Sequence, residues 1–254
     1  MTTVTGRMNA LARAELTLLG RSRATLVTAV LVPLLLPLSV RSAISGMDLA
    51  DAGLTAGTVL LPAAVGFSLL FAVYAALTNA YVVRREELVL KRLRTGELRD
   101  PEILVGAALP ASAIGLVQCV LLAAGCTVLL DLGAPPAPHL AVVGVLLGLV
   151  LCVALAAVTA AFTRTAESAQ VTSLPMMFVS MLGSGLAVPL EVLPDRLASV
   201  CELLPLTPAI TLVRGGWTGN LSASDALGAV VVALAWTAVA LFAVRRWFRW
   251  EPRR

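Results

Sequence analysis

The chain has 254 residues, of which 59% are hydrophobic and 13% are charged, and its formal net charge is +4. A soluble domain carries about 25% charged residues, so this composition excludes an ordinary soluble protein and indicates an integral membrane protein. The apolar residues form long blocks rich in Leu, Val and Ala, which predicts an all-α fold of membrane-spanning helices, whereas a β-barrel would show short alternating segments. We attribute the net charge to basic residues gathered on one side of a membrane and not to nucleic-acid binding.

The first 23 residues are polar to amphipathic, which predicts a helix lying in the headgroup region before the first span. A solvated N-terminal helix is the alternative. The first apolar block, residues 26–40, is short and contains Pro33 and Pro37. A cleaved signal peptide is disfavoured for this block, because no clear cleavage site follows it and five more spans do.

Five further apolar blocks are long enough to cross a bilayer, which takes roughly 20 residues. They cover residues 59–83, 103–130, 140–162, 171–188 and 226–244. We therefore expect one transmembrane domain of six helices over residues 1–254. Sixteen of the nineteen Lys and Arg residues fall on the side that holds both termini, which predicts that both termini are cytoplasmic. Arginine far outnumbers lysine, and alanine, glycine and leucine are abundant. This composition is typical of a GC-rich bacterial genome, so we expect a protein of the bacterial inner (plasma) membrane.

Residues 189–225, between the last two blocks, form the longest outer loop, and this loop is semi-apolar. A soluble extracellular loop would be more polar. We therefore expect a short helix over residues 197–206 that lies on the membrane or dips into it.

Several kinds of catalysis are excluded by missing residues. The single lysine, Lys91, has Leu90 before it, so the chain holds no P-loop. The single histidine, His139, excludes an H-E-x-x-H zinc site, and no C-x-x-C occurs, so no metal site is predicted. Gly183–Gly185 and Glu86–Glu87 faintly suggest intramembrane proteases, but the histidines that such mechanisms need are absent or out of reach. We expect a protein that is not itself an enzyme.

Residues 84–102 form the only densely charged segment between apolar blocks, with six basic and five acidic residues. Membrane orientation requires only basic residues, so the presence of both signs predicts a short cytosolic helix that binds a partner. Leu88, Leu93 and Leu98 would supply its apolar contacts. Glu87 and Lys91 are four residues apart, a spacing at which opposite charges pair on a helix. A loop that only sets orientation is the alternative.

This segment resembles the first cytosolic loop of the permease subunits of type-2 ABC transporters, whose pattern runs roughly R-E-x-x-x-x-K-R-L-R-x-x-P-L-x-x-x-E-I-L-x-G. The sequence matches that pattern at Arg85, Glu86, Lys91, Arg92, Leu93, Arg94, Leu98, Glu102, Ile103, Leu104 and Gly106. It departs at Glu97, where the family often has Pro, and at Glu87–Leu88, where many members have Arg-Gly. The last outer loop is also similar to that family, in the spacing of Pro189, Pro194, Pro205 and Arg214.

The resemblance implies a permease subunit of an ATP-driven exporter, of the kind that exports drugs, antibiotics or polysaccharides. In the family this loop docks a separate ATP-binding subunit, so ATP and Mg²⁺ are expected on that partner and no cofactor on this chain. A second copy or a related permease is expected to pair with it in the lipid membrane. The resemblance assigns ATPase coupling to Arg85, Glu86, Glu87, Lys91, Arg92, Leu93, Arg94 and Leu98.

The substrate route is weakly marked. No span carries a charged residue at its centre, which argues against a proton-driven antiporter. Candidate route residues are Thr78, Asn79, Ser173, Met177, Ser180 and Ser184. Helix–helix packing is the alternative for each of them. We expect a lipophilic drug-like, antibiotic-like or lipid substrate; an ATP-independent transporter or channel, and a non-transporting scaffold, are the alternative functions.

Overall fold

The computed structural model describes residues 55–96, 98–130 and 132–251. The expected N-terminal helix and the first apolar block lie outside this range. Within it the regular structure is entirely helical. Four helical segments of the described chain are long and apolar enough to cross a membrane, or five if a bent helix pair counts as one crossing. The predicted all-α membrane fold is confirmed.

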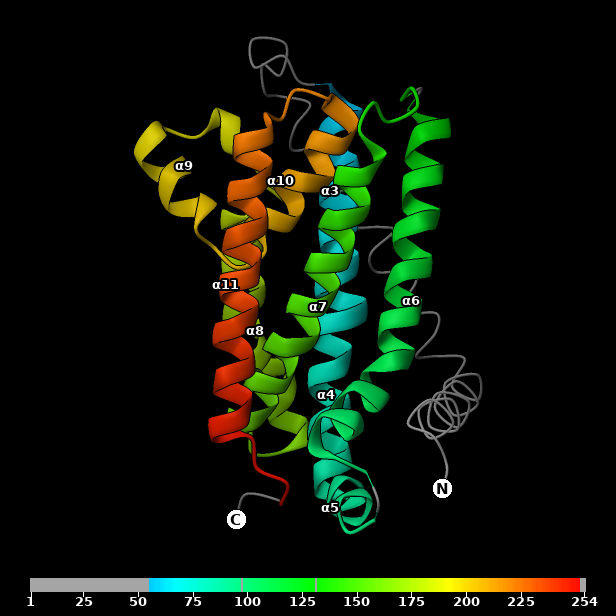
Figure 1. The fold of residues 1–254 in the computed structure, drawn as a ribbon, viewed down its shortest axis with the longest axis vertical. Coiled ribbons are helices and arrows are strands. Elements are labelled where there is room, and N and C mark those ends of the chain that lie inside the picture. The colour runs from blue at the N-terminus through cyan, green and yellow to red at the C-terminus, as the bar shows by residue number, and fades with distance from the viewer. Residues whose placement is uncertain (1–54, 97, 131, 252–254) are drawn as a thin grey trace.

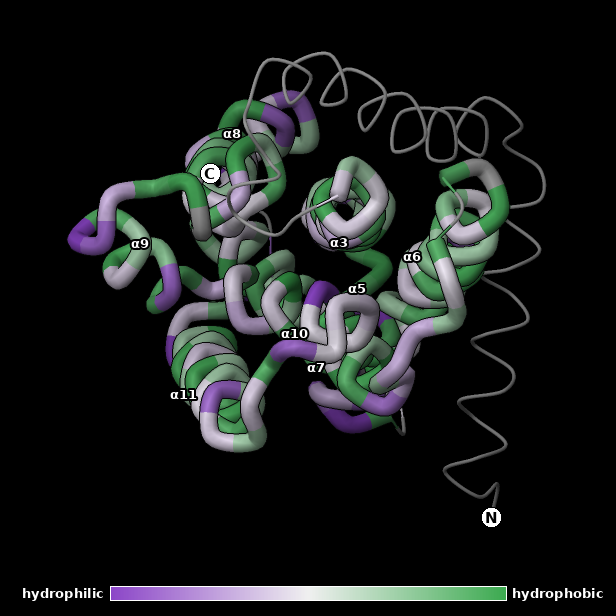
Figure 2. The backbone as a smooth tube through the Cα atoms, turned by 90° about the horizontal axis from the view of Figure 1, so that it is seen from above, coloured by the Kyte–Doolittle hydropathy of each residue, from purple (hydrophilic) through white to green (hydrophobic). Residues whose placement is uncertain are grey.

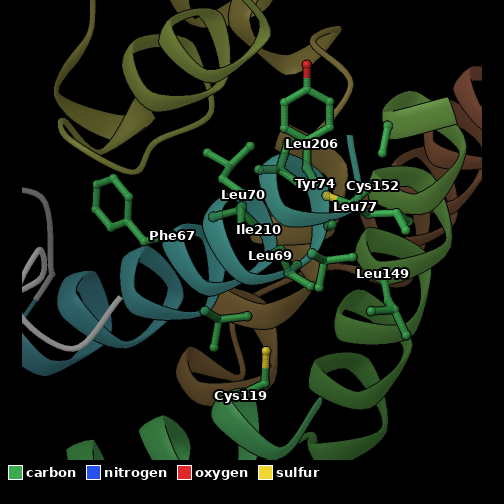
Figure 3. Packing of buried hydrophobic residues seen from close by; sticks show 14 of the residues in the cluster. Phe67, Leu69, Leu70, Tyr74, Leu77, Cys119, Leu149, Cys152, Leu206 and Ile210 are labelled. Atoms are coloured by element: carbon green, nitrogen blue, oxygen red, sulfur yellow. The ribbon is translucent and has the colours of Figure 1, made fainter. Parts of the chain in front are cut away.

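The most deeply buried segment combines α3 (Ala56–Ser68), the π-helical η1 (Leu69–Ala75) and α4 (Ala76–Glu86). The Thr55 side chain caps the first turn of α3 by accepting from the main-chain N–H of Thr58 at 3.3 Å. Seen along the long axis, α3 lies between α6 and α8 (Figure 2). Figure 3 shows Leu69, Leu70 and Tyr74 within the apolar core that this segment organises.

Two helices follow α4 at its charged end. The short α5 (Val89–Arg94) is separated from α4 by Leu88, and α6 (Asp100–Leu129) runs back along α3. The Glu102 carboxylate accepts from the main-chain N–H of Arg99 at 3.0 Å, which fixes the first turn of α6. The charged segment is therefore the end of α4, a separate short helix and the start of α6, and not one helix as expected.

The next two helices are α7 (Pro138–Phe162) and α8 (Ala166–Gly183). The span expected at residues 171–188 begins earlier and stops at Gly183. Beyond it, Gly185 has φ = +71°, a left-handed conformation that favours glycine and turns the chain away from the helix. Among the described helices, α8 does not reach the length and apolarity of the four spans.

The segment expected as an outer loop contains a second, buried helix. It holds the one-turn η2 (Leu190–Val192), α9 (Asp195–Glu202) and α10 (Thr207–Thr218). The helix predicted at 197–206 corresponds to α9, which begins two residues earlier and ends four residues earlier than predicted. It meets α10 at 105°. Whereas α9 stands at the edge of the molecule (Figure 1), α10 packs against α3, α7 and α11.

The last helix, α11 (Ala223–Trp247), is followed by a non-helical tail from Phe248 to Glu251. This tail and α5 lie at one end of the molecule, and α9 and α10 lie toward the other end (Figure 1). The fold therefore brings the charged segment and the C-terminal tail together, although more than 140 residues separate them in the sequence.

Candidate functional site

The turn between α4 and α5 is built around Leu88, which has φ = +61°. This left-handed conformation costs about 1–2 kcal/mol for a residue that has a Cβ. The main-chain N–H of Leu88 donates to the carbonyl of Arg85 at 3.1 Å and so closes the end of α4. Its side chain nevertheless stays 38% exposed. Because Leu88 is strained and partly exposed, contacts within this chain stabilise it little. Such a residue is a candidate for contact with another protein.

Arg85, immediately before this turn, points into the protein and is only 1% exposed. Its guanidinium donates to three carbonyl oxygens at the end of α7: Ala160 at 2.7 Å, Thr163 at 2.6 Å and Arg164 at 3.3 Å. The last carbonyls of a helix have no partner within the helix and carry partial negative charge, so a buried cation is stabilised there. Arg85 is therefore a structural residue within this chain and not part of its exposed surface.

Glu86 makes the complementary contact. Its Oε2 accepts from the main-chain N–H of Ala166, the first residue of α8, at 3.2 Å. The N-terminus of a helix carries partial positive charge and free N–H groups, which a carboxylate satisfies. Two adjacent residues at the end of α4 thus hold both sides of the α7–α8 turn, Arg85 at the end of one helix and Glu86 at the start of the next.

The exposed charges of this region lie on α5. Lys91, Arg92 and Arg94 are exposed, whereas Leu93 is half-buried. Leu90 is completely buried and attaches α5 to the rest of the protein. Leu88, Leu93 and Leu98 were predicted from the sequence as apolar contacts. Leu90 was not predicted, because a six-residue helix is too short to show an apolar periodicity.

The expected pairing of Glu87 with Lys91 on one helix does not occur, because Leu88 breaks the helix between them. Glu87 is an exposed residue at the end of α4. Leu98 is half-buried in the link that leads to α6.

The C-terminal tail supplies the partner of Lys91. The Lys91 Nζ lies 2.7 Å from Oε1 of Glu251, and this neighbouring cation lowers the pKa of the Glu251 carboxyl from its ordinary value. The Arg94 guanidinium lies 5.1 Å from the centroid of the Trp250 ring, within cation–π range. Its Nε also lies 3.0 Å from Oδ1 of Asp100.

A cleft of about 590 Å³ opens between α5 and the tail. Its lining residues are Lys91, Arg94, Thr95, Arg249, Trp250 and Glu251. The tail's part in this cleft was not predicted from the sequence. The one available signal was Glu251, an isolated carboxylate among the C-terminal arginines.

The candidate route residues do not share one environment. The hydroxyl of Thr78 donates to the Tyr74 carbonyl at 2.8 Å, and that of Ser173 donates to the Gln170 carbonyl at 2.8 Å, so both bond their own helices. Ser184 accepts from the Thr207 hydroxyl at 3.1 Å. The remaining three candidates are Asn79, which is exposed, Met177, which is half-buried, and Ser180, which is buried.

The prolines of the outer-loop motif lie at helix boundaries. Pro189 precedes η2, Pro194 precedes α9, and Pro205 lies in the break between α9 and α10. Each fits its place, because proline lacks the N–H that a helix interior requires.

Arg214, the last residue of this motif, is buried on α10, where its Nη2 donates to the Gly185 carbonyl at 3.1 Å. This contact ties the turn after α8 to α10.

The sequence profile of the family described as ABC-2 type transporter matches residues 7–217, which include the charged segment and the helices from α3 to all but the last residue of α10. None of the curated proteins compared with the chain matches it. The profile covers most of the sequence and confirms the resemblance found in the charged segment. The chain belongs to the ABC-2 type transporter family and is a permease subunit of an ABC transporter.

Proposed function

We propose that this chain is the permease of an ATP-driven exporter and that α5 docks a separate ATP-binding subunit. The observation that carries the proposal is the α4–α5 turn, where a strained, exposed Leu88 precedes the exposed cations Lys91, Arg92 and Arg94. An apolar side chain surrounded by charges is the composition of a protein-docking surface, with an anchor at its centre and polar groups around it. The sequence holds no P-loop, so the proposal assigns ATP and Mg²⁺ to the partner.

The α7–α8 turn supplies a path for motion. Closure of the ATP-binding subunits around ATP displaces α5, which is joined to α4 through Leu88. Arg85 and Glu86 move with the end of α4, and their hydrogen bonds carry the displacement to the ends of α7 and α8. A switch of this kind requires two arrangements with different contacts in each, and this turn is the element that both arrangements would share.

The remaining parts of the proposal follow from the family and from charge. Two copies, or this chain and a related permease, pair in a bacterial plasma membrane with both termini in the cytoplasm. The grouping of α5 and the C-terminal tail at one end supports that orientation (Figure 1). The substrate is a lipophilic drug-like, antibiotic-like or lipid molecule that leaves toward the α9–α10 end.

The docking test co-expresses the chain with a P-loop ATPase selected from the genes that neighbour its own. Leu88→Asn keeps a residue that tolerates the left-handed conformation but removes the apolar side chain. Arg92→Glu reverses one exposed charge. We expect each variant to weaken association of the two subunits by about tenfold, the effect of losing one interface anchor, and to stop ATP-dependent export.

Arg196→Glu is the matched control, because Arg196 is an exposed arginine on α9 at the far end. It should leave association unchanged. Normal association of the Leu88→Asn, Arg92→Glu double variant would overturn the proposal. Export driven by an ion gradient in liposomes without ATP would support a secondary transporter instead.

A further inference from the structure

We infer that the C-terminal tail, Phe248 to Glu251, is the second half of the docking surface, and that the cleft between this tail and α5 receives an acidic segment of the ATP-binding subunit. This inference rests on the proposed function and extends it from one helix to two segments. The sequence pattern alone pointed to the charged segment as the docking site and not to the tail.

The tail has a fixed place on the protein. The Phe248 ring packs edge-on against Tyr81 of α4, with ring centroids 6.3 Å apart, and against Trp250 at 5.1 Å. The Tyr81 hydroxyl in turn donates to the Leu104 carbonyl of α6 at 2.9 Å. Aromatic pairs in this geometry are worth about 0.5–1.5 kcal/mol beyond their buried area. The tail is thus packed against the same helix ends that carry α5.

The tail also contacts α5 directly, through the Lys91–Glu251 ion pair and through Arg94 over the Trp250 ring. Surface ion pairs alone contribute little to stability, so these contacts position the two segments more than they hold the fold together. Their effect is to set α5 and the tail side by side as the two walls of one cleft.

The charges of the cleft indicate its occupant. The lining contributes the three cations Lys91, Arg94 and Arg249 and the carboxylate of Glu251. Asp100, beside the cleft, pairs with Arg94, and the balance of these five groups is still positive. Its volume of about 590 Å³ suits several side chains of a protein segment. Arg and Trp are the residues most enriched at the energetic centres of protein interfaces. An acidic protein segment matches this combination of charge and aromatic surface.

An anionic lipid surface is the competing occupant, and two contacts disfavour it. The Trp250 ring is engaged by Arg94 and by Phe248 and does not stand out from the surface as a membrane anchor would. The Glu251 carboxylate at the edge of the cleft would be repelled by anionic headgroups. We therefore assign the cleft to the same partner as α5.

The test measures binding of the purified ATP-binding subunit to the full-length chain in detergent. Arg249→Glu reverses a charge of the cleft without touching α5, and Trp250→Ala removes the aromatic wall. Arg246→Glu is the matched control, an exposed arginine on the last turn of α11 outside the cleft. We expect Arg249→Glu to weaken binding about tenfold and to reduce its salt dependence, and we expect Arg246→Glu to leave both unchanged.

Trp250→Phe controls for the possibility that Trp250→Ala misfolds the tail, because it keeps an aromatic ring beside Arg94. It should bind more tightly than Trp250→Ala at the same thermal stability. A photo-crosslinking amino acid in place of Arg249 should form a covalent adduct with the ATP-binding subunit, and one in place of Arg196 on α9 should not.

The possible results separate the two proposals. If Arg249→Glu and Trp250→Ala bind normally while Arg92→Glu does not, the tail is not part of the docking surface and the role of α5 stands. If Arg92→Glu with Leu88→Asn also binds normally, both proposals fail. If Arg249→Glu reduces binding of short-chain phosphatidylglycerol to the detergent-purified chain but does not reduce binding of the ATP-binding subunit, the cleft is a lipid site and this inference is wrong.

Discussion

The Arg85 guanidinium donates to the Thr163 carbonyl at 2.6 Å across 78 residues of sequence, inside a part of the protein that excludes water. The contact joins the end of α4, which leads into the proposed docking helix α5, to the end of α7. Its neighbour Glu86 accepts from Ala166 at the start of α8. The proposed path from α5 into the membrane depends on these two residues, and both can be tested separately from docking.

Arg85→Met should destabilise the protein, because it leaves buried carbonyls at the end of α7 without their charged donor. Hydrogen bonds to charged groups contribute about 1.5–3 kcal/mol each, so a loss of several kcal/mol is expected. Arg85→Lys keeps the charge but not the forked geometry, and should recover part of the stability. Thermal unfolding in detergent measures both, with Arg92→Met as the exposed control. Equal melting temperatures for Arg85→Met and Arg92→Met would contradict the assignment.

Glu86→Ala should cost about 1 kcal/mol of stability, the usual cost of losing a side-chain acceptor at a helix N-terminus. Glu86→Gln keeps an acceptor and loses only the charge, so its effect should be smaller. Glu87→Ala, at the exposed neighbouring position, should change stability by less than about 0.5 kcal/mol.

The same Glu86 variant tests transmission. Because Glu86 joins α4 to α8 and lies outside the α5 surface, Glu86→Ala should still bind the ATP-binding subunit but export less substrate per ATP hydrolysed. Hydrolysis and export are measured together in proteoliposomes. An unchanged ratio of export to hydrolysis would exclude Glu86 from the path.

Gly144→Ala should disturb the packing of α10 on α7. A Cβ at this position would lie 2.7 Å from the Ala209 carbonyl and 2.9 Å from the Val213 main-chain nitrogen, both backbone atoms of α10. Overpacking of this kind costs about 1–3 kcal/mol. Gly228→Ala in α11 meets nothing within 4 Å and is the matched control. Thermal unfolding of the two variants should therefore differ, with Gly144→Ala the less stable.

The contact between Glu251 and Lys91 should be lost at low pH. Lys91 lowers the pKa of Glu251 below its ordinary value of 4.5, so the attraction is fully present above that value and is lost as pH falls through the lowered pKa. Trp250 emission, taken as the difference between the wild type and Trp250→Phe, should report the loss of this neighbouring ion pair below pH 4.5, while the Phe248 contacts keep the tail in place. Glu251→Gln should show no such step. High salt should weaken the contact at every pH, because both side chains are exposed.

Composition and periodicity were sufficient to predict the membrane class and the approximate helix positions. The blocks predicted at 59–83, 103–130, 140–162 and 226–244 each lie within two residues of a described helix or inside it. Such helices can be predicted from their own stretch of sequence, because each must satisfy its backbone hydrogen bonds internally in lipid. The charged segment was recognisable for a related reason, since eleven charges between two spans have no place in the membrane.

The amino-acid sequence by itself therefore determined that this is a helical membrane protein of the ABC-2 type with one charged segment. Only the tertiary structure decided which charges of that segment stay exposed. The arginines of the segment, among them Arg84, Arg85 and Arg92, are chemically alike. The Arg85 guanidinium nevertheless binds carbonyl oxygens at the end of α7, whereas the Arg92 side chain is exposed. Residues 207–218, which the sequence predicted as part of an outer loop, form the buried helix α10. Lys91 likewise pairs with Glu251 of the tail. These outcomes depend on contacts between segments far apart in the chain, and no local propensity encodes such contacts.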